Sequence, residues 1–266
     1  MSESKSPSET HLEQSVALLN YLVTEQKRAR RRTLIRYGMI AVFVLAYGIF
    51  LAALAMRNST PSAPDQGYVS LVRLEGEIGP GKAISAEKVN PLLTKAFEDE
   101  KAKGVILVMN SPGGSPVQSS LIFDHLQRLR AENPAKKLVV VGEDLVASGG
   151  YFIASAADKI VVNRSTVTGS IGVITASFGF SSLMEKIGVE RRVITAGEAK
   201  NSMDPFVPQK EEDQARTREL IADIHEHFID AVKAGRGDRL DLSTPELFSG
   251  KVWTGSAAVR HGLAAE

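Results

Sequence analysis

The sequence predicts an α/β domain built on a parallel sheet and preceded by one transmembrane helix. The first observation behind this prediction is a stretch of uncharged residues at positions 37–56. The second is a series of short apolar segments from Tyr68 onward, separated by amphipathic ones, which is typical of parallel strands connected by helices. The third is length, because about 200 residues follow the uncharged stretch and can bury the core of one domain.

The uncharged stretch, YGMIAVFVLAYGIFLAALAM, would span about 30 Å as a helix, the thickness of a hydrocarbon core. The basic residues just before it are Lys27, Arg28, Arg30, Arg31, Arg32 and Arg36, whereas Arg57 is the nearest charge after it. This asymmetry predicts a cytoplasmic N-terminus and an outer C-terminal domain. The alternative is a cleaved signal peptide, because Ala53-Leu54-Ala55 resembles a cleavage site. However, the stretch exceeds the roughly 7–15 residues of a signal peptide and follows a polar arm.

The predicted organisation has four parts. Residues 1–36 form a basic cytosolic arm, and residues 37–56 form the transmembrane helix. Residues 57–67 form a linker rich in Ser, Pro and Gly, and residues 68–266 form the outer domain. The net charge of +1 gives no indication of a nucleic-acid partner. The absence of cysteine excludes disulfides, thiol catalysis and cysteine-based metal sites.

Hydrophobic periodicity then sets the expected elements of the outer domain. The expected strands are residues 68–74, 104–109, 138–141, 159–162, 171–174 and 190–194. The expected helices are residues 85–98, 118–130, 149–157, 180–187 and 209–233.

Three glycine-containing loops stand beside these strands, at the edge where open α/β sheets bind ligands. The loop at residues 110–116 (NSPGGSP) follows the strand 104–109 and can point backbone N–H groups into a cavity, as half of an oxyanion hole. Taken alone, it is better explained as an ordinary glycine turn. The loop at residues 168–173 (TGSIGV) surrounds Ser170 with glycines and could equally be a turn.

The loop at residues 144–151 (DLVASGGY) places Ser148 where a strand leads into a helix, with two glycines directly behind it. Small neighbours leave the hydroxyl accessible, and the Gly149 N–H at the helix N-terminus can stabilise an oxyanion. The commoner use of such a serine is as a helix N-cap. The motif is not G-x-S-x-G, so it does not indicate an α/β-hydrolase.

A serine nucleophile needs a base, and none of the five histidines lies in a loop after a predicted strand. Lys200 does, since it follows the expected strand 190–194. To act as a base it must be neutral, which requires its pKa to fall by about 3 units from about 10.4. The neighbouring Glu198 would oppose that shift if it faced the same pocket. In isolation, Lys200 is better explained as an exposed loop lysine.

Taken together, four motifs in this order resemble the signal peptide peptidase A family in its short, single-domain bacterial form. They are Ser-Pro-Gly-Gly (111–114), Ala-Ser-Gly-Gly-Tyr (147–151), Thr-Gly-Ser-Ile-Gly-Val (168–173) and Gly-x-x-Lys (197–200). The resemblance runs from about Val69 to Leu263. It implies the Clp protease/crotonase fold and a serine protease with a Ser/Lys dyad.

The resemblance also implies a role for each site residue. Ser148 would be the nucleophile, Lys200 the general base, and the Gly114 and Gly149 N–H groups the oxyanion hole, while Ser170 would orient the lysine. No metal or cofactor is implied. The implied substrates are residual signal peptides and other membrane-associated polypeptides with small or apolar side chains. The implied setting is the bacterial inner membrane, in a homo-oligomeric ring whose Ser and Lys can come from neighbouring subunits.

Three alternatives stay open at this point. A crotonase-type enzyme acting on an acyl-CoA thioester would use the same glycine-rich loops, although an outer domain argues against a cytosolic substrate. A non-catalytic membrane scaffold would have no use for both Ser148 and Lys200. A related membrane protease with a dedicated protein substrate cannot be separated from signal-peptide digestion by the sequence.

Overall fold

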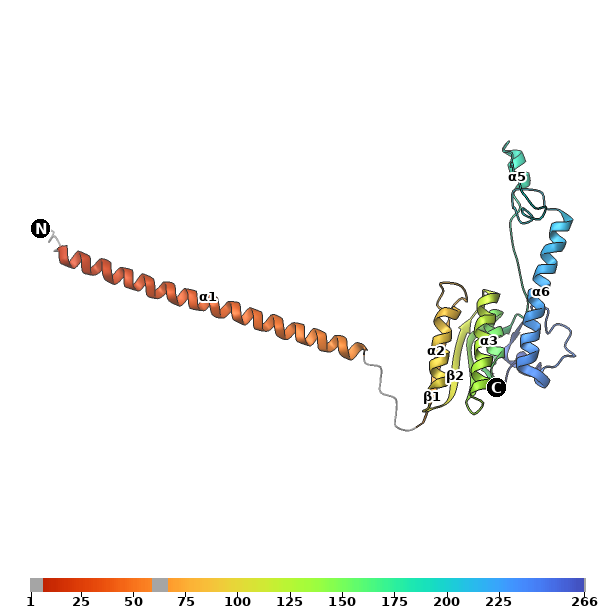
Figure 1. The fold of residues 1–266 in the computed structure, drawn as a ribbon, viewed down its shortest axis with the longest axis horizontal. Coiled ribbons are helices and arrows are strands. Elements are labelled where there is room, and N and C mark those ends of the chain that lie inside the picture. The colour runs from red at the N-terminus through yellow and green to blue at the C-terminus, as the bar shows by residue number, and fades with distance from the viewer. Residues whose placement is uncertain (1–6, 59–66, 266) are drawn as a thin grey trace. The chain divides into compact units, whose positions relative to one another are not determined.

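The computed structural model describes residues 7–58 and 67–265. The chain divides into two compact units, residues 1–63 and 64–266, which are described separately. The N-terminal unit contains one long helix, α1 (Pro7–Asn58), shown in red and orange in Figure 1. Most of the expected linker, residues 59–66, lies outside the described residues.

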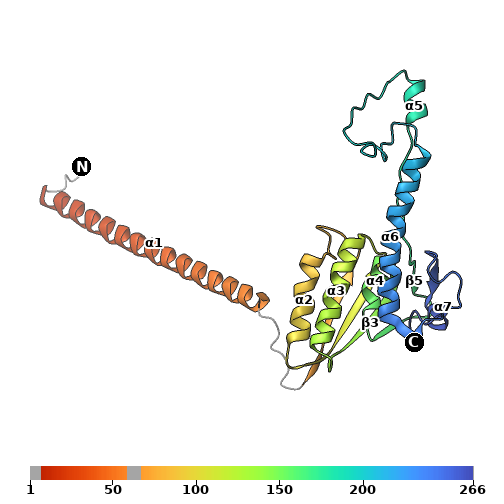
Figure 2. The same cartoon turned by 45° about the vertical axis from the view of Figure 1, so that its right-hand side comes forward.

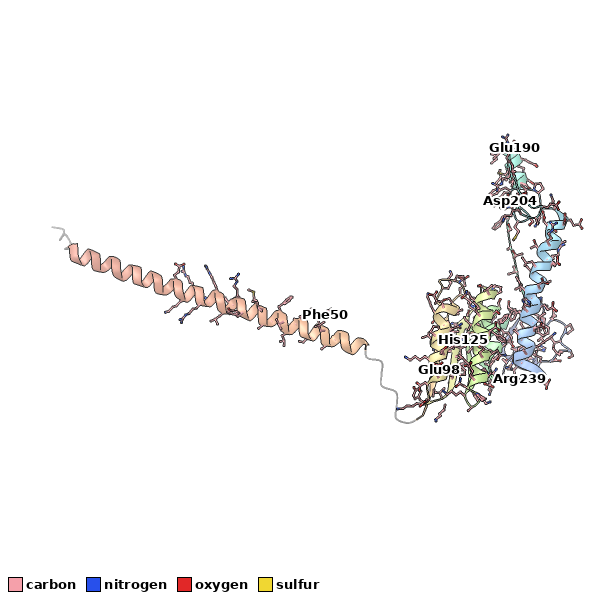
Figure 3. The ribbon with its side chains drawn as sticks, viewed as in Figure 1. Phe50, Glu98, His125, Glu190, Asp204 and Arg239 are labelled. Carbon is pink, nitrogen blue, oxygen red and sulfur yellow. The ribbon has the colours of Figure 1, made fainter. Side chains whose placement is uncertain are left out.

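Within the described part of the chain, one stretch is long and apolar enough to cross a bilayer by its length and composition. It is Arg30–Ala53 of α1, with 24 residues and a mean hydropathy of 2.0. Its large apolar side chains are exposed, among them Val42, Phe43 and Leu45, and Figure 3 labels Phe50 on the same helix. None of the described side chains covers this stretch, which fits a helix that lipid would surround.

The second unit is built on a six-stranded sheet. Its strands are β1 (Tyr68–Glu75), β2 (Ala102–Ser111), β3 (Lys137–Ala147), β4 (Lys159–Val162), β5 (Val167–Gly169) and β6 (Val252–Thr254). The order is β1-β2-β3-β5-β6, and β4 also pairs with β3. Every pairing is parallel except the antiparallel β5–β6 pair. The fold is therefore mixed α/β with a largely parallel sheet, as expected.

Four helices pack one against the next along the sheet in the order α2, α3, α4, α6 (Figure 2). They span Ala86–Glu98, Pro116–Glu132, Gly149–Ser155 and Glu211–Arg236. The shorter helices are α5 (Ser181–Lys186), α7 (Gly255–Arg260) and the 3-10 turn Gly237–Arg239. Helix α2 buries Val89, Leu93 and Phe97, which recur every four residues and therefore share one face.

Two expected strands are wrong, and two observed strands were not expected. Residues 171–174 and 190–194 form no strand. The unexpected strands are β5, which ends just before residue 171, and β6, which lies near the C-terminus and pairs with β5. A strand needs a neighbour to accept its hydrogen bonds, and residues 190–194 are exposed and pair with none of the described residues. In addition, β3 continues to Ala147, so most of the expected loop before Ser148 is strand.

Residues 175–210, which we call the projecting segment, extend away from the sheet beyond the N-terminal end of α6 (Figures 1 and 2). Glu190 and Asp204 mark it in Figure 3. Its internal contacts include the stacked rings of Phe180 and Phe206, 5.6 Å apart, and a 2.9 Å ion pair between Arg191 and Asp204. The N–H of Phe206 and the Arg191 guanidinium lower the pKa of Asp204 against the opposing effect of burial.

Candidate active site

Ser148 stands between the end of β3 and the start of α4, in a backbone conformation that serine rarely adopts. Its φ is 52° and its ψ is −126°, outside the regions favoured by residues with a Cβ. Two hydrogen bonds hold it there. Its N–H donates to the Gly169 carbonyl at 2.9 Å, and its own carbonyl accepts from the Phe152 N–H at 2.9 Å. Such a conformation costs roughly 1–3 kcal/mol and persists only where the surroundings enforce it.

The Ser148 side chain is not a helix cap. Ser148 occupies the N-cap position of α4, but its hydroxyl makes no capping hydrogen bond, unlike Ser115 at the start of α3. Ser148 is half-buried, and it borders a cavity instead. The hydroxyl is therefore held in a defined place without being committed to the helix.

Two backbone N–H groups lie next to Ser148 without an acceptor among the described residues, those of Gly114 and Gly149. A Cβ added to Gly149 would lie 3.3 Å from the Gly114 nitrogen, so the two residues are close neighbours. Gly114 has a φ of 146°, and a Cβ there would lie 2.0 Å from the Ile78 carbonyl oxygen, so only glycine fits. A free amide pair beside a serine is the geometry of an oxyanion hole.

Ser170 follows β5 as Ser148 follows β3. These strands are parallel, and Ala147 pairs with Gly169, so the two serines emerge side by side from the same sheet edge. Ser170 also has a positive φ, of 51°, and its N–H donates to the Lys251 carbonyl at 2.9 Å. The structure thus brings four of the five expected site residues together: Ser148, Gly149, Gly114 and Ser170.

A small apolar cavity of about 120 Å³ opens at this edge. Its lining residues are Gly114, Pro116, Ser148, Gly149, Phe152, Gly172, Val173, Ile174, Ile224 and Phe228. The rings of Phe152 and Phe228 stack with their centroids 4.8 Å apart, so they join α4 to α6 in the wall of the cavity. No charged side chain lines it, so it suits a small apolar group placed beside the Ser148 hydroxyl.

Helix α4, which carries Ser148 and Gly149 at its N-terminus, is anchored by hydrogen bonds to the C-terminal segment of the chain. The buried Tyr151 hydroxyl donates to the Leu263 carbonyl at 2.7 Å, and the Arg236 guanidinium donates to the adjacent Gly262 carbonyl. Burial raises the pKa of Tyr151 well above its usual range and lowers the pKa of Arg236. The tyrosine therefore stays neutral, and the helix is held to the C-terminal segment by a hydrogen bond that does not titrate near neutral pH.

Lys200 is the site residue that the structure does not bring to the others. It lies in a turn of the projecting segment, where its N–H donates to the Gly197 carbonyl at 3.2 Å. Its side chain is exposed and does not line the cavity beside Ser148. Within the described residues of a single chain, Ser148 and Lys200 make no contact.

The histidines whose side chains are described do not replace it. His125 contacts Thr94 and Arg128, and Figure 3 shows it on α3. His261 contacts Thr244, His225 contacts the Ile171 carbonyl, and His227 is exposed. None of these four lines the cavity.

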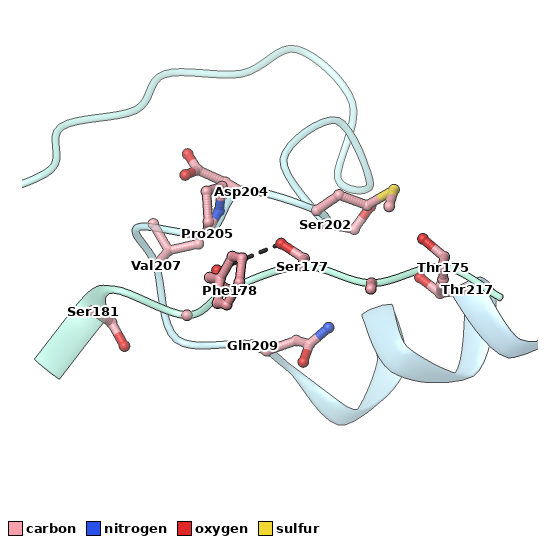
Figure 4. Close-up of a pocket in the computed structure, with 13 residues that line it drawn as sticks. Thr175, Ser177, Phe178, Ser181, Ser202, Asp204, Pro205, Val207, Gln209 and Thr217 are labelled. Carbon is pink, nitrogen blue, oxygen red and sulfur yellow. Dashed lines mark hydrogen bonds between the residues drawn. The ribbon is translucent and has the colours of Figure 1, made fainter.

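A larger pocket of about 520 Å³ lies between the projecting segment and Thr217 of α6 (Figure 4). Of the residues that line it, only Asp204 is ionisable, and its carboxylate is engaged by Arg191. This pocket therefore lacks a nucleophile–base pair. Across the described residues, no group of three or more His, Asp or Glu side chains could hold a metal ion.

The apolar wall of the small cavity was not anticipated from the sequence. Ile224 and Phe228 come from α6, and Phe152 comes from α4. A usable signal was present, because Ile224 and Phe228 are four residues apart and share one face of a helix whose other positions are mostly polar. What the spacing could not show is that this face meets the Ser148 edge.

Comparison with known proteins gives a consistent result. The model for Peptidase family S49 matches residues 130–266, which include Ser148, Gly149, Ser170 and Lys200. The chain is 33% identical over 196 residues to the chloroplastic serine protease SPPA of Arabidopsis thaliana, covering 73% of this chain and 28% of that one. It is 31% identical over 227 residues to Protease 4 of Haemophilus influenzae, covering 84% and 36%.

A further relative is named as an ion antiporter rather than as a protease. The chain is 48% identical over 200 residues to the Na(+)/H(+) antiporter NhaA of Brucella melitensis, covering 73% of this chain but 27% of that one. The similar region thus spans between 27% and 36% of the length of these three relatives. The family and the protease relatives support a serine peptidase rather than an acyl-CoA enzyme.

Proposed function

Because this chain belongs to peptidase family S49, we propose that it is a membrane-anchored serine endopeptidase that cleaves peptides through an acyl-enzyme on Ser148. One observation carries the proposal. A serine in a strained conformation presents an uncommitted hydroxyl beside two unpaired N–H groups and an apolar cavity. A nucleophile, oxyanion donors and a place for a substrate side chain are three of the parts that acyl transfer needs, and a general base is the fourth.

The proposed reaction has two stages. Neutral Lys200 takes the proton of Ser148, whose oxygen attacks the peptide carbonyl. The N–H groups of Gly114 and Gly149 stabilise the negative charge that develops on the carbonyl oxygen. The lysine then protonates the leaving amine, and water releases the acyl group from Ser148. Ser170, which emerges next to Ser148, would orient the lysine.

Lys200 would reach the site from a neighbouring subunit of a homo-oligomeric ring. Two observations support this part of the proposal. Lys200 lies in the projecting segment, away from the Ser148 of its own chain, and that segment exposes large apolar side chains such as Phe178 and Ile194. Exposed apolar surface of this kind is typical of an interface with another chain. Enclosure at the interface would also provide the desolvation that a neutral lysine requires.

The proposed substrates are residual signal peptides and other membrane-associated polypeptides. The cavity of about 120 Å³ and its apolar lining favour a small aliphatic side chain at the residue whose carbonyl is attacked. Anchoring by α1 would keep the site beside the bilayer, where apolar peptides accumulate. A dedicated protein substrate is the alternative, and mass spectrometry of the peptides that accumulate in membranes lacking this protein separates the two.

The proposed orientation places the N-terminus in the cytoplasm and the catalytic domain on the outer side of the inner membrane. It rests on the basic residues just before the apolar stretch and the near absence of charge just after it. An alkaline phosphatase reporter fused after Gly67 should be active. If instead a fluorescent protein that fluoresces only in the cytosol is fused at the same position and is fluorescent, this would contradict both the orientation and the substrate class.

The test of the function is peptide cleavage by the full chain in mild detergent. Ser148→Ala and Lys200→Ala should each reduce kcat by at least about a thousandfold, because each removes a group that acts in the transition state. Ser165→Ala and Lys95→Ala, at exposed positions outside the projecting segment, serve as matched controls and should cleave like the unmodified chain. Full activity in either site variant would exclude the Ser/Lys dyad.

A further inference from the structure

Besides helices α4 and α6, residues 170–174 form part of the wall of the cavity beside Ser148. Residues 170–174 run from Ser170 along the cavity, which Gly172, Val173 and Ile174 line. After Ser170 these residues form no strand, so no ladder of hydrogen bonds fixes them. Their position depends on individual contacts, and the carbonyl of Ile171 accepts two of the hydrogen bonds that hold them.

The Ile171 carbonyl accepts two hydrogen bonds. One comes from the Gly250 N–H at 3.0 Å, and the other joins it to Nε2 of His225 at 3.0 Å. Because a carbonyl oxygen can only accept, Nε2 must carry the hydrogen in this contact. Ile171 is fully buried, so loss of the histidine would leave part of the hydrogen-bonding capacity of a buried carbonyl unsatisfied.

His225 lies on α6 between the two residues that this helix contributes to the cavity. Ile224 precedes it and Phe228 is three residues later, and both line the cavity. The bond from His225 to Ile171 therefore joins two segments that both line the cavity, residues 172–174 and helix α6. Phe228 in turn stacks on Phe152, so α6 is itself held against α4.

We propose that His225 is a positioning residue that sets the width of the cavity beside Ser148, by tying the Ser170–Ile174 wall to helix α6. This rests on the proposed function, in which the cavity receives a substrate side chain. The neutral ring and the protonated ring both carry a hydrogen on Nε2 in this arrangement. The tie therefore needs an N–H donor at that position and does not need a group that titrates.

Because the contact needs only an N–H donor, two substitutions of His225 can distinguish a positioning role from a catalytic one. His225→Ala removes the donor, whereas His225→Gln can place an amide N–H near the position of Nε2 but cannot act as a general base. His227→Ala is the matched control, because His227 is on the same helix and exposed. Two peptides are compared, one with leucine and one with glycine at the residue whose carbonyl is attacked.

We expect His225→Ala to lower kcat/KM for the leucine peptide about tenfold, the effect of losing one hydrogen bond to a buried acceptor. The glycine peptide, which does not fill the cavity, should change by less than about twofold. His225→Gln should restore the leucine peptide to within about threefold at every pH tested, and His227→Ala should behave as the unmodified chain. Melting temperatures are measured in parallel. If the alanine variant is unstable, His225→Leu, which keeps the bulk without the donor, should show the same loss.

Two results would overturn the inference. One is unchanged discrimination between leucine and glycine in His225→Ala. The other is an equal loss on both peptides in His225→Ala and His225→Gln, which would make the histidine a base or a general structural residue. Ser148→Ala is assayed alongside. Cleavage by Ser148→Ala would reject the proposed function itself, whereas an inactive Ser148→Ala with a fully discriminating His225→Ala rejects only the role of His225.

Discussion

Two serines carry the backbone strain of the catalytic unit. Among the described residues, Ser148 and Ser170 are the non-glycine residues with positive φ, at 52° and 51°. They follow neighbouring parallel strands at paired positions, so the strain is concentrated at one point of the sheet edge. Strain of this kind is retained where the surrounding structure enforces it, which is common at sites that must present a group in one orientation.

Gly114 provides the sharpest residue-scale prediction. In Gly114→Ala, the new Cβ would lie 2.0 Å from the Ile78 carbonyl, at a φ that alanine rarely adopts, so the loop and its N–H must move. Loss of one oxyanion donor should lower kcat about 100-fold to 1,000-fold. The assay is peptide cleavage, with melting temperature measured on the same sample.

The control for that variant is Gly81→Ala. Gly81 also has a positive φ, of 75°, but a Cβ there would meet nothing within 4 Å. It therefore reproduces the backbone strain at a distance from Ser148 and should keep its activity. Activity within about threefold of normal in Gly114→Ala would remove Gly114 from the oxyanion hole.

At the scale of elements, the sequence predicted the parts of the sheet that are long and apolar. The strands β1, β2, β3 and β4 and helices α2, α3, α4, α5 and α6 are confirmed, because apolar runs and helical periodicity identify them directly. The short strand β5 contains a buried threonine and pairs through only three residues, so it left no periodic signal. β6 also has only three residues, and it pairs with a strand far away in the sequence.

The same distinction explains the candidate site. Ser148, Gly149, Gly114 and Ser170 meet because parallel strands end at a common edge, which the sequence pattern could predict. The position of Lys200 could not be predicted that way. It was placed by a strand at residues 190–194 that the structure does not contain. The apolar wall from α6 depends on how a helix docks, which no local pattern encodes.

Asp158 gives a prediction for how these elements are held together. Its carboxylate accepts from the Leu138 N–H at the start of β3, at 2.9 Å, and from Arg130 of α3, at 2.7 Å. Burial opposes the charged form, but these donors outweigh it and lower the pKa of Asp158. The resulting stability is present above the unfolded pKa of about 3.9 and is lost as pH falls through the lower folded value.

Asp158→Asn should therefore lower the free energy of unfolding by about 2 kcal/mol at pH 7, the scale of a charge-assisted hydrogen bond. The difference from the unmodified chain should shrink as pH falls below about 3.9 and disappear only below the lowered pKa of folded Asp158, where both chains carry a neutral side chain. Urea unfolding across this pH range measures it, with the exposed Asp238→Asn as control. A pH-independent difference would mean that charge is not the cause.

At the scale of the whole molecule, no lysine or histidine among the described residues of one chain lines the cavity beside Ser148. The projecting segment carries Lys200 and exposes several large apolar side chains, including Phe178, Ile194 and Met203. Both features are explained if the segment packs on a neighbouring copy and completes its site. A ring of head-to-tail contacts would give every Ser148 one such neighbour.

Mixing two inactive variants tests this assembly. Ser148→Ala and Lys200→Ala chains should each be inactive alone, and co-expression should restore activity to about a quarter of normal, because random pairing gives that share of intact neighbours. The two chains carry different affinity tags so that mixed assemblies can be purified and assayed. Mixed assemblies that remain inactive would show that Ser148 and Lys200 must belong to one chain.

The central claim is that Ser148 is the nucleophile, and covalent labelling tests it most directly. The full chain in mild detergent is treated with a fluorophosphonate, which reacts with activated serines, and the modified residue is located by mass spectrometry of the digested protein. One adduct is expected, on Ser148, together with loss of peptide cleavage and no labelling in Ser148→Ala. Complete inhibition with Ser148 unmodified and another residue labelled would contradict it.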